Sequence, residues 1–383
     1  MKALAITTIA IVGIIASTIV WFVMRADPMG GEPLVVVQID PAARPAAGLA
    51  SGPPVPDVKE VAPVAPVVPP PSAVPEQQNL PATAFSGPQQ PAQTTPQPET
   101  ANVPADQELV RLPPVPIRAV VEKSRYGPLP KIASDGRRPS EVYARPVNGA
   151  VASGAGQPAR IALLITGLGL SEIATTQAID SLPGPVTLAF GPYGRNLEGW
   201  VRKARDLGHE VMLQVPLEPF DYPDNDPGPH TLLTSLPAEE NMKRLHWIMS
   251  RFTGYTGITN HMGAKFAAAQ DSFLPVLEEL KARGLIYLDD GTAARSTAGQ
   301  IARDLGLDYS ASQVVIDEER NAREIELALK KLEGIAKEKG LAIGVGTSLP
   351  LTIGRVAEWS RQLKDKGIEL IPISAAVRSD RQT

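Results

Sequence analysis

Hydrophobic and polar positions follow two alternating patterns from about residue 160 onward. Short apolar runs, typical of buried strands, are separated by longer stretches with apolar residues every three or four positions, typical of amphipathic helices. The predicted strands are Ile161–Ile165, Val186–Phe190, Val211–Val215, Tyr255–Thr259, Leu285–Leu288, Val314–Ile316, Ala342–Val345 and Glu369–Pro372. The predicted helices are Ser171–Leu182, Leu197–Leu207, Ala238–Phe252, Asp271–Arg283, Ser296–Leu305, Ala322–Lys339 and Ile353–Lys366.

Eight strands that alternate with seven helices predict an α/β protein built from parallel βα units. Eight such units close naturally into a barrel, and an open doubly wound sheet is the alternative. The sequence contains no Gly-x-Gly-x-x-Gly or phosphate-loop motif, which disfavours a nucleotide-binding open sheet. We therefore expect a (β/α) barrel.

The first residues have the pattern of a membrane span. Residues 3–24 carry no charge, with Lys2 before them and Arg25 after them. A helix of this length spans a bilayer, and the bulky end Trp21–Met24 suits the membrane interface better than a signal-peptide cleavage site. We expect residues 1–27 to be a single-pass transmembrane anchor in the inner membrane, with the rest of the chain in the periplasm.

Composition divides the remainder of the chain. Most of its 39 prolines fall between Pro28 and Pro158. The Pro-, Ala-, Val- and Gln-rich residues 28–108 predict a disordered linker. Residues 109–159 regain apolar residues and paired charges, and predict an irregular strap that packs on the barrel. We place the barrel domain at residues 160–378 and a short tail at 379–383.

Charge and cysteine content exclude some functions. The formal net charge is −4, with acidic and basic residues interspersed, so nothing suggests a nucleic acid partner. The chain has no cysteine, which excludes disulfides and thiolate metal sites.

Ligands of α/β proteins bind at the carboxyl ends of the parallel strands. Residues directly after the predicted strands should therefore converge on one cleft. They comprise carboxylates, a histidine, hydroxyls and amides, which suit a sugar or a hard cation. The predicted cleft residues are Thr166, Tyr193, Gln214, Glu218, Asn260, His261, Asp289, Asp290, Asp317 and Thr347, with Ser374 after the eighth strand.

Two hydrolytic chemistries are open to these residues. His261, Asp289, Asp290 and Asp317 could supply the ligands of a metal hydrolase. Glu218 with Asp289 or Asp290 could supply the paired carboxylates of a glycosidase. A serine hydrolase is disfavoured, because no Gly-x-Ser-x-Gly motif is present.

Several segments, in order, resemble the divergent polysaccharide deacetylases: Leu188–Tyr193, Gly208–Val211, Pro216–Pro219, Pro227–Leu233, Asn260–Gly263, Arg283–Asp289 and Val315–Asp317. The resemblance extends from Arg160 to Val377. It implies a deformed (β/α) barrel, a metal site and activity on the N-acetyl groups of glycans such as chitin and peptidoglycan.

The sequence departs from this family pattern at the site itself. The resemblance implies Ile-Asp-Asp-Leu-Gly after the first strand, whose aspartates act as base and metal ligand, but this chain has Thr166 and Gly167 there. Gln214 stands where a histidine is implied, and Thr347 where Gly-His-Pro is implied. The implied ligands that remain, and that would hold Zn²⁺ if a metal is retained, are His261, Asp289 and Asp317.

Threonine and glycine provide neither a base nor an anionic ligand at neutral pH. We therefore expect a deacetylase-like protein that binds envelope polysaccharide, needs no cofactor and has lost most or all catalysis. The alternative is an active metal-dependent deacetylase with a rebuilt site that includes Glu218 and Asp290. A third possibility is a cleft without a ligand in a protein that binds an envelope protein.

Overall fold

The computed structural model describes residues 110–147 and 158–380. The predicted anchor at 1–27, the predicted linker at 28–108 and the last three residues of the predicted tail lie outside this part of the chain. Among the residues described, the longest helices lack the combination of length and apolar character that a membrane span requires.

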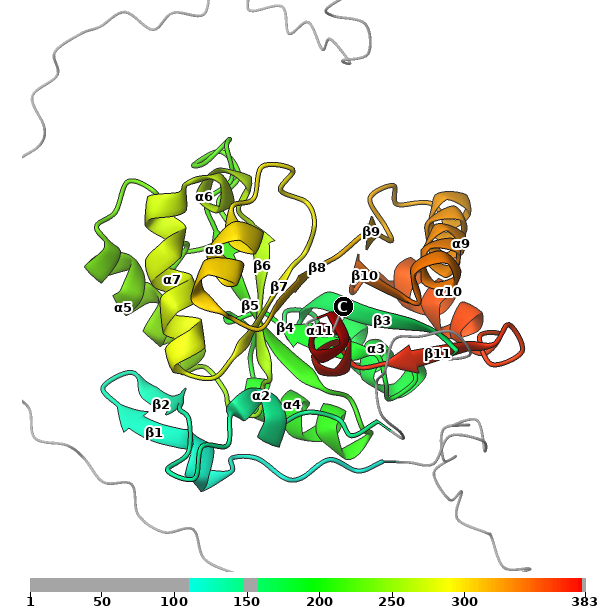
Figure 1. Cartoon of the computed structure of the whole chain (residues 1–383), viewed down its shortest axis with the longest axis horizontal. Coiled ribbons are helices and arrows are strands. Elements are labelled where there is room, and N and C mark those ends of the chain that lie inside the picture. Colours follow the sequence, from blue (N-terminus) through cyan, green and yellow to red (C-terminus); the bar gives the residue numbers. More distant parts are fainter. Residues whose placement is uncertain (1–109, 148–157, 381–383) are drawn as a thin grey trace, which may run out of the picture. The chain divides into compact units, whose positions relative to one another are not determined.

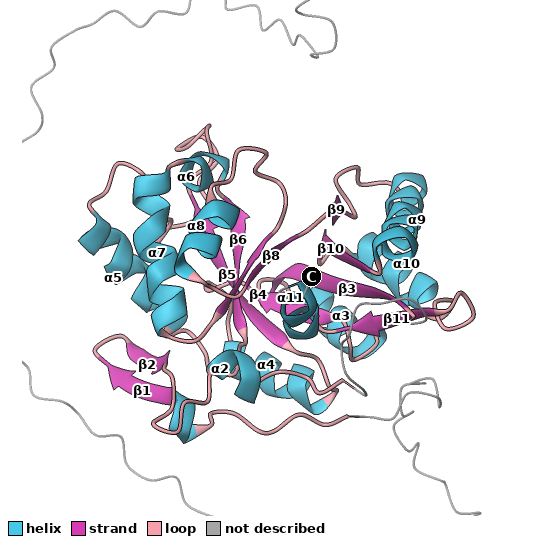
Figure 2. Cartoon of the chain, viewed as in Figure 1, coloured by secondary structure: helices cyan, strands magenta, loops and turns pink. Residues whose placement is uncertain are grey.

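The main sheet consists of parallel strands flanked by helices (Figures 1 and 2), which confirms the predicted α/β class and barrel-like arrangement. Its strands are, in spatial order, β8 (Tyr309–Ala311), β7 (Ile286–Asp289), β6 (Gly257–Met262), β5 (Val211–Leu217), β4 (Thr187–Phe190), β3 (Ala159–Leu168), β10 (Leu341–Thr347) and β9 (Val314–Val315), with β11 (Ile368–Ile371) paired to β3.

The two ends of this strand order are joined by the chain itself. Two residues separate β8 from β9, so one segment pairs first with β7 and then with β10. The predicted even series of eight strands is therefore wrong in two places. The three-residue strand β8 was missed, and β11 does not complete the series. Instead, β11 pairs with the start of β3, along the edge that β4 occupies further on.

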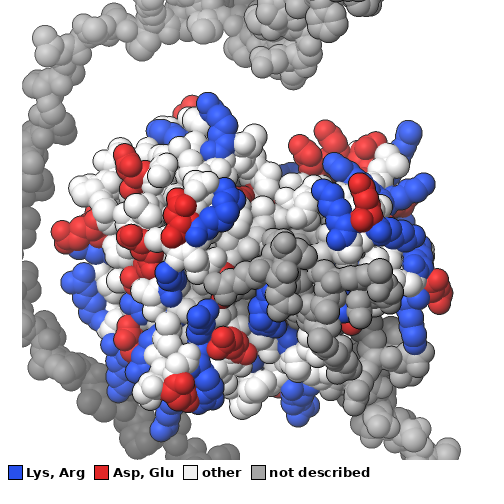
Figure 3. Space-filling model, viewed as in Figure 1, with Lys and Arg blue, Asp and Glu red and all other residues white. Residues whose placement is uncertain are grey.

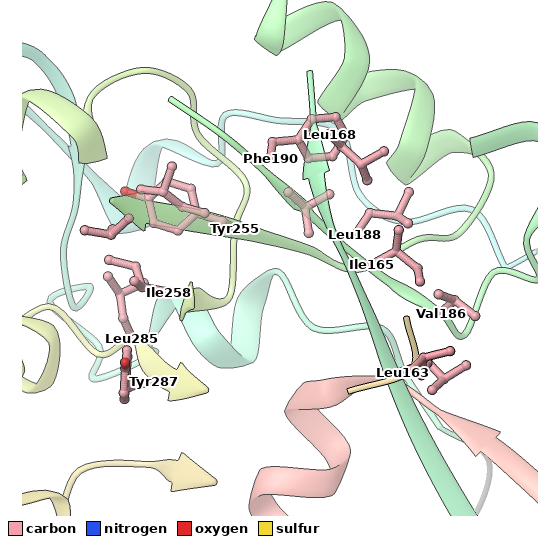
Figure 4. Packing of buried hydrophobic residues seen from close by; sticks show 14 of the residues in the cluster. Leu163, Ile165, Leu168, Val186, Leu188, Phe190, Tyr255, Ile258, Leu285 and Tyr287 are labelled. Atoms are coloured by element: carbon pink, nitrogen blue, oxygen red, sulfur yellow. The ribbon is translucent and has the colours of Figure 1, made fainter. Parts of the chain in front are cut away.

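The two faces of the sheet pack against different partners. Leu163 and Ile165 of β3 belong to a cluster with the surrounding helices (Figure 4), whereas Ala162 and Leu164 face the concave side. This follows from the period of two along a strand. The helices of the convex side are α3 (Glu172–Ser181), α4 (Leu197–Asp206), α5 (Ala238–Met249), α7 (Gln270–Ala282), α8 (Ala298–Leu305), α9 (Ala322–Lys339) and α10 (Pro350–Ser360).

The concave side is filled by the C-terminal helix α11 (Ile373–Asp380). Its Ala375 and Ala376 are fully buried against the strands, together with Ala162 and Ala189. Small side chains on both sides allow the helix to approach the sheet closely. The sequence did not predict α11, because its buried residues lack an amphipathic period, and it also missed the short helix α6 (Ala264–Ala268). It placed α10 three residues too late, because Pro350 opens that helix.

Ser374 lies far from the predicted cleft, which corrects its assignment. Its backbone N and its Oγ both donate to the carboxylate of Glu210, which precedes β5 at the amino-terminal end of the strands. Glu210 is completely buried, and this desolvation raises its pKa, although hydrogen bonds from Ser374 and Arg145 oppose the shift. Ser374 therefore fixes α11 to the end of the sheet opposite the cleft.

Residues 110–147, which we call the strap, contain regular elements where irregular structure was predicted. They are the 3-10 turn η1 (Arg118–Val120), the antiparallel hairpin β1 (Val121–Ser124) and β2 (Gly127–Pro130), and the short helix α2 (Pro139–Val142). The strap contacts the turns that precede β5, β7 and β8. The contacts are Arg145 Nη1 to Gly208 O (2.7 Å), Ser140 N to Gly284 O (3.2 Å) and Arg138 Nη1 to Asp308 Oδ2 (3.2 Å).

Arg205, in the last turn of α4, fastens the strap at two points. Its guanidinium donates to Pro113 O from Nε and Nη2 (both 3.2 Å) and to Tyr143 O from Nη1 (2.9 Å). The side chain is 1 % exposed, and this burial lowers its pKa to about 10, so it stays charged at neutral pH. One buried cation thus satisfies carbonyl groups near both ends of the strap.

Arg205→Met should lower the free energy of unfolding by about 3 kcal/mol, because it leaves buried carbonyls without donors. Urea unfolding measures the loss, and limited proteolysis should show earlier cleavage in the strap. Arg202→Met, at an exposed position of the same helix, is the matched control and should change stability little. Equal stability of the two variants would show that the hydrogen bonds of Arg205 do not stabilise the attachment of the strap.

Glu279 of α7 joins the strap hairpin to α5. Its Oε1 accepts from His246 Nε2 and from Arg283 Nε (2.6 Å each), and Arg283 also donates to Pro130 O and Glu122. The bond from His246 and those from Arg283 outweigh desolvation and lower the pKa of Glu279 to about 2, from a usual value of 4.5. The stability that this carboxylate contributes is present above pH 4.5 and is lost as the pH falls toward 2.

Glu279→Gln should therefore lower the free energy of unfolding by about 2 kcal/mol at pH 6, with a smaller difference from wild type at each step below pH 4.5. Urea unfolding at a series of pH values measures this. The control is Glu278→Gln at the exposed neighbouring position, which should match wild type. A difference between Glu279→Gln and wild type that is constant from pH 6 to pH 2.5 would exclude this linkage.

Candidate ligand-binding site at the carboxyl ends of the strands

The alternation along the strands sorts the predicted cleft residues into two sets. Side chains two positions beyond concave-facing core residues also face the concave side. Asn260 and Asp289 instead follow Ile258 and Tyr287, which face the helices. The residues of the concave set that lie within the strands, which we call the mouth, are Thr166, Gln214, His261 and Thr347, together with Thr259. By the same rule Asp290, directly after β7, follows the concave-facing Leu288 and borders the mouth.

Asn260 holds the loop after β7 in place. It is 1 % exposed, and its Oδ1 accepts from Tyr287 Oη (3.2 Å) and from Asp290 N (3.0 Å). Its Nδ2 donates to Met262 O at 2.9 Å. Every polar atom of its side chain is thus engaged within the protein, and its role is to position neighbouring residues.

The two aspartates after β7 are also bound within their own loop. Asp289 accepts from Gly291 N (3.0 Å) and from Ser296 Oγ (2.6 Å). Asp290 Oδ1 accepts from Thr292 N (2.9 Å) and Thr292 Oγ1 (2.7 Å), while burial raises the pKa of Asp290. Asp289 therefore shapes the loop, and Asp290 lies next to it at the end of β7.

Glu218, directly after β5, forms an ion pair with Lys265 in which the carboxylate is buried and the lysine side chain is partly exposed. Its Oε1 accepts from Lys265 Nζ (2.7 Å), and its Oε2 accepts from Thr234 N (2.6 Å) and Thr234 Oγ1 (2.7 Å). Burial by itself would raise the pKa of Glu218, but the hydrogen bonds from Lys265 and Thr234 outweigh it and lower the pKa. The carboxylate is therefore ionised and already paired.

Tyr193 supports the loop between β5 and α5. Its Oη accepts from His230 N at 3.0 Å, and a Cβ at Gly228 would come within 2.4 Å of the tyrosine ring. His230 in turn stacks on Trp247, with ring centroids 3.6 Å apart. Tyr193 is thus half-buried beneath a loop, and these contacts assign it a structural role.

Asp317, after β9, is bonded to the end of β10. Its Oδ2 accepts from Thr347 N (2.9 Å), from Thr347 Oγ1 and from Thr352 Oγ1 (2.7 Å). Its Oδ1 is buried and finds no hydrogen-bond partner among the residues that the structure describes. Thr347 therefore gives its hydroxyl hydrogen to this carboxylate.

A row of hydrogen bonds continues from β10 across β3 and β5 to β6. Ser348 Oγ donates to Gly167 O (3.2 Å), and Gly167 N donates to Gln214 Oε1 (3.0 Å). Gln214 Nε2 lies 3.4 Å from His261 Nδ1. Gly167 and Gln214, which both depart from the family pattern, are thus bonded to each other. Thr166 donates to Gly346 O at 3.2 Å beside them.

A sharp turn exposes His261 at the end of β6. Met262 and Gly263 both adopt positive φ (56° and 98°), and a Cβ at Gly263 would lie 2.4 Å from Leu217 Cβ. The chain turns away here and begins α6, so the imidazole remains exposed to solvent. Neighbouring atoms nevertheless desolvate the ring enough to lower its pKa.

These residues do not fit a catalytic zinc ion. In residues 110–147 and 158–380, no three His, Asp or Glu side chains lie close enough to hold one metal. Both carboxylate oxygens of Asp289 and the Oδ2 of Asp317 accept hydrogen bonds from internal donors, and His261 directs Nδ1 toward Gln214. Since a catalytic Zn²⁺ needs three protein ligands, His261, Asp289 and Asp317 do not form such a set.

One protein family accounts for both this fold and these sequence motifs. The model of the divergent polysaccharide deacetylases matches residues 163–377, more than half of the chain, so this protein is a member of that family. The predicted resemblance is confirmed. A solved structure, the uncharacterized protein ATU2773 of Agrobacterium tumefaciens C58, is 42 % identical with a TM-score of 0.63, over 65 % of this chain and 99 % of that chain.

Two further relatives are more distant. The uncharacterized protein YibQ of Escherichia coli strain K12 is 23 % identical over 51 % of this chain. The match spans 60 % of YibQ, less than two thirds of its length. An uncharacterized protein of Haemophilus influenzae strain Rd is 22 % identical over 58 % of this chain and 78 % of its own.

Thr259 is a mouth residue that the sequence analysis missed. It is fully buried, and its Oγ1 finds no hydrogen-bond partner within the described part of the chain. It is paired with Gln214 in the ladder between β5 and β6. Its place in the mouth could have been predicted from the sequence, because Thr259 precedes His261 by two positions in one strand and must face the same side of the sheet.

Asp317→Ala should lower the free energy of unfolding by about 2–3 kcal/mol, since Thr347 and Thr352 lose a shared charged acceptor. The measurement is urea unfolding of the variant beside Glu318→Ala, the control at the exposed next position. A loss for Asp317→Ala no larger than that for Glu318→Ala would show that this network contributes little.

Proposed function

We propose that this protein binds N-acetylated envelope polysaccharide at the mouth and has lost most or all deacetylation. The observation that carries the proposal is the hydrogen bond from Gly167 N to Gln214 Oε1. The resemblance implies an aspartate and a histidine at these two positions. Here an amide and a backbone N–H satisfy each other where a metal and its ligands would be held.

Hydrolysis of an acetamide requires an activated water and a base that takes its proton. Thr166 and Gly167 offer no base, and Asp317 already accepts three hydrogen bonds from Thr347 and Thr352. Binding requires less, because sugar hydroxyls and acetamido groups need well-placed donors and acceptors. His261 is exposed at the mouth and can provide such a contact.

The location of the protein belongs to the same proposal. The apolar residues 3–24 support a single-pass anchor in the inner membrane, with the barrel in the periplasm. Acidic and basic side chains alternate over the face shown in Figure 3, which suits a polar surface without strong attraction for a polyanion.

Binding of chitin and peptidoglycan oligomers to the full chain in detergent tests this function. We expect binding by calorimetry that His261→Ala weakens at least tenfold, with little or no release of acetate. Arg202→Ala, distant from the mouth on α4, is the control and should bind like wild type.

Stoichiometric zinc together with acetate release that His261→Ala abolishes would overturn this proposal and establish the alternative, an active deacetylase with a rebuilt site. Absence of both glycan binding and acetate release would also overturn it and would favour an envelope protein as the partner.

A further inference from the structure

Gln214 has a fixed amide orientation. It is 6 % exposed in the middle of the buried strand β5, and its Oε1 accepts the backbone N–H of Gly167 at 3.0 Å. An amide nitrogen has no lone pair to accept this bond, so the oxygen must face Gly167. The NH₂ group of Gln214 must then face the opposite way, toward β6.

His261 lies in that direction, with its Nδ1 3.4 Å from Gln214 Nε2. The NH₂ group can only donate, so the Nδ1 of His261 must accept and cannot carry a hydrogen. A neutral imidazole has one N–H, and here it must be on Nε2. The backbone of Gly167 thereby sets the tautomer of a side chain three strands away in the sheet.

We propose that Gln214 is a positioning residue that holds His261 as the neutral Nε2–H tautomer. His261 then presents a hydrogen-bond donor to the mouth and has no free lone pair for a metal ion. The groups it recognises are acceptors, such as the carbonyl oxygen of an acetamido group or a carboxylate oxygen. The identity of this ligand, though not the tautomer, rests on the proposed function.

The neighbouring positions are consistent with this role. Met262 and Gly263 turn the chain immediately after His261, so the ring edge that bears Nε2 is left to solvent and ligand. The position that faces Gln214 in the strand ladder is Thr259, a small hydroxyl residue. Gly167 can send its N–H across to Gln214 because its φ of 79° is one that glycine adopts readily.

Gln214→Glu is the decisive variant, because it keeps the size of the side chain and one acceptor for Gly167 N. Its second carboxylate oxygen would face Nδ1 and require a hydrogen there. Gln214→Leu removes both polar groups and leaves the ring free to exchange tautomers. Side-chain nitrogen NMR of the ¹⁵N-histidine-labelled full chain distinguishes the tautomers, and His261→Gln identifies the signals of His261 among those of the four histidines.

We expect wild type to show Nε2–H, Gln214→Glu to show a hydrogen on Nδ1, and Gln214→Leu to show an intermediate mixture. Added Zn²⁺ should leave the His261 signals of wild type unchanged. Equal signals in wild type and Gln214→Glu, or coordination of Zn²⁺ by His261 in wild type, would overturn the inference. These spectra are recorded without glycan, so failure of glycan binding would count against the proposed function alone.

Discussion

The pairing of β3 determines the rest of this structure. This ten-residue strand pairs with β10 along one edge and shares its other edge between β11 and β4. Residues Ile161 to Ile165 are completely inaccessible to solvent, which requires cover on both faces of the sheet. The outer helices cover one face. The small side chains of α11 cover the other, and the carboxylate of Glu210 holds the start of that helix.

Much of this fold could be predicted from the sequence, because buried parallel strands are continuous apolar runs and several helices end at a glycine, such as α8 at Gly306 and α9 at Gly340. What could not be predicted depended on tertiary context. The strand β8 is three residues long, and the first five residues of α11, Ile373–Val377, are all buried, so they show no amphipathic period. The candidate site was likewise predicted only in part. Reading one residue past each strand found Gln214 and His261, but it also placed Asn260 and Asp289 in the cleft. Those two side chains face the helices, because side-chain direction alternates along a strand and both residues still belong to their strands, β6 and β7.

The departures from the family pattern are not independent losses. Gly167 and Gln214 contact each other, and Thr347 contacts the retained Asp317. Each of these substituted positions therefore has a hydrogen-bond partner within the site. An isolated loss of a metal ligand would leave its neighbours as buried charges without partners, at a cost of several kcal/mol. The site has instead become a network of mutually bonded amides, hydroxyls and carboxylates, in which Thr259 Oγ1 and Asp317 Oδ1 have no partner among the described residues. Such a network favours a well-ordered binding surface over chemistry that needs a reactive water.

The strap has a mechanical consequence. It meets the barrel at turns that precede β5, β7 and β8, on the side opposite the mouth. A force that pulls on the chain at Leu112 would act first on the hydrogen bonds of Arg205 and then on the β1–β2 hairpin, which Arg283 holds in place. These bonds lie at the far ends of α4 and α7, and the carboxyl ends of the strands are outside this line of force. The barrel can therefore be pulled from one side while the geometry around His261 stays unstrained.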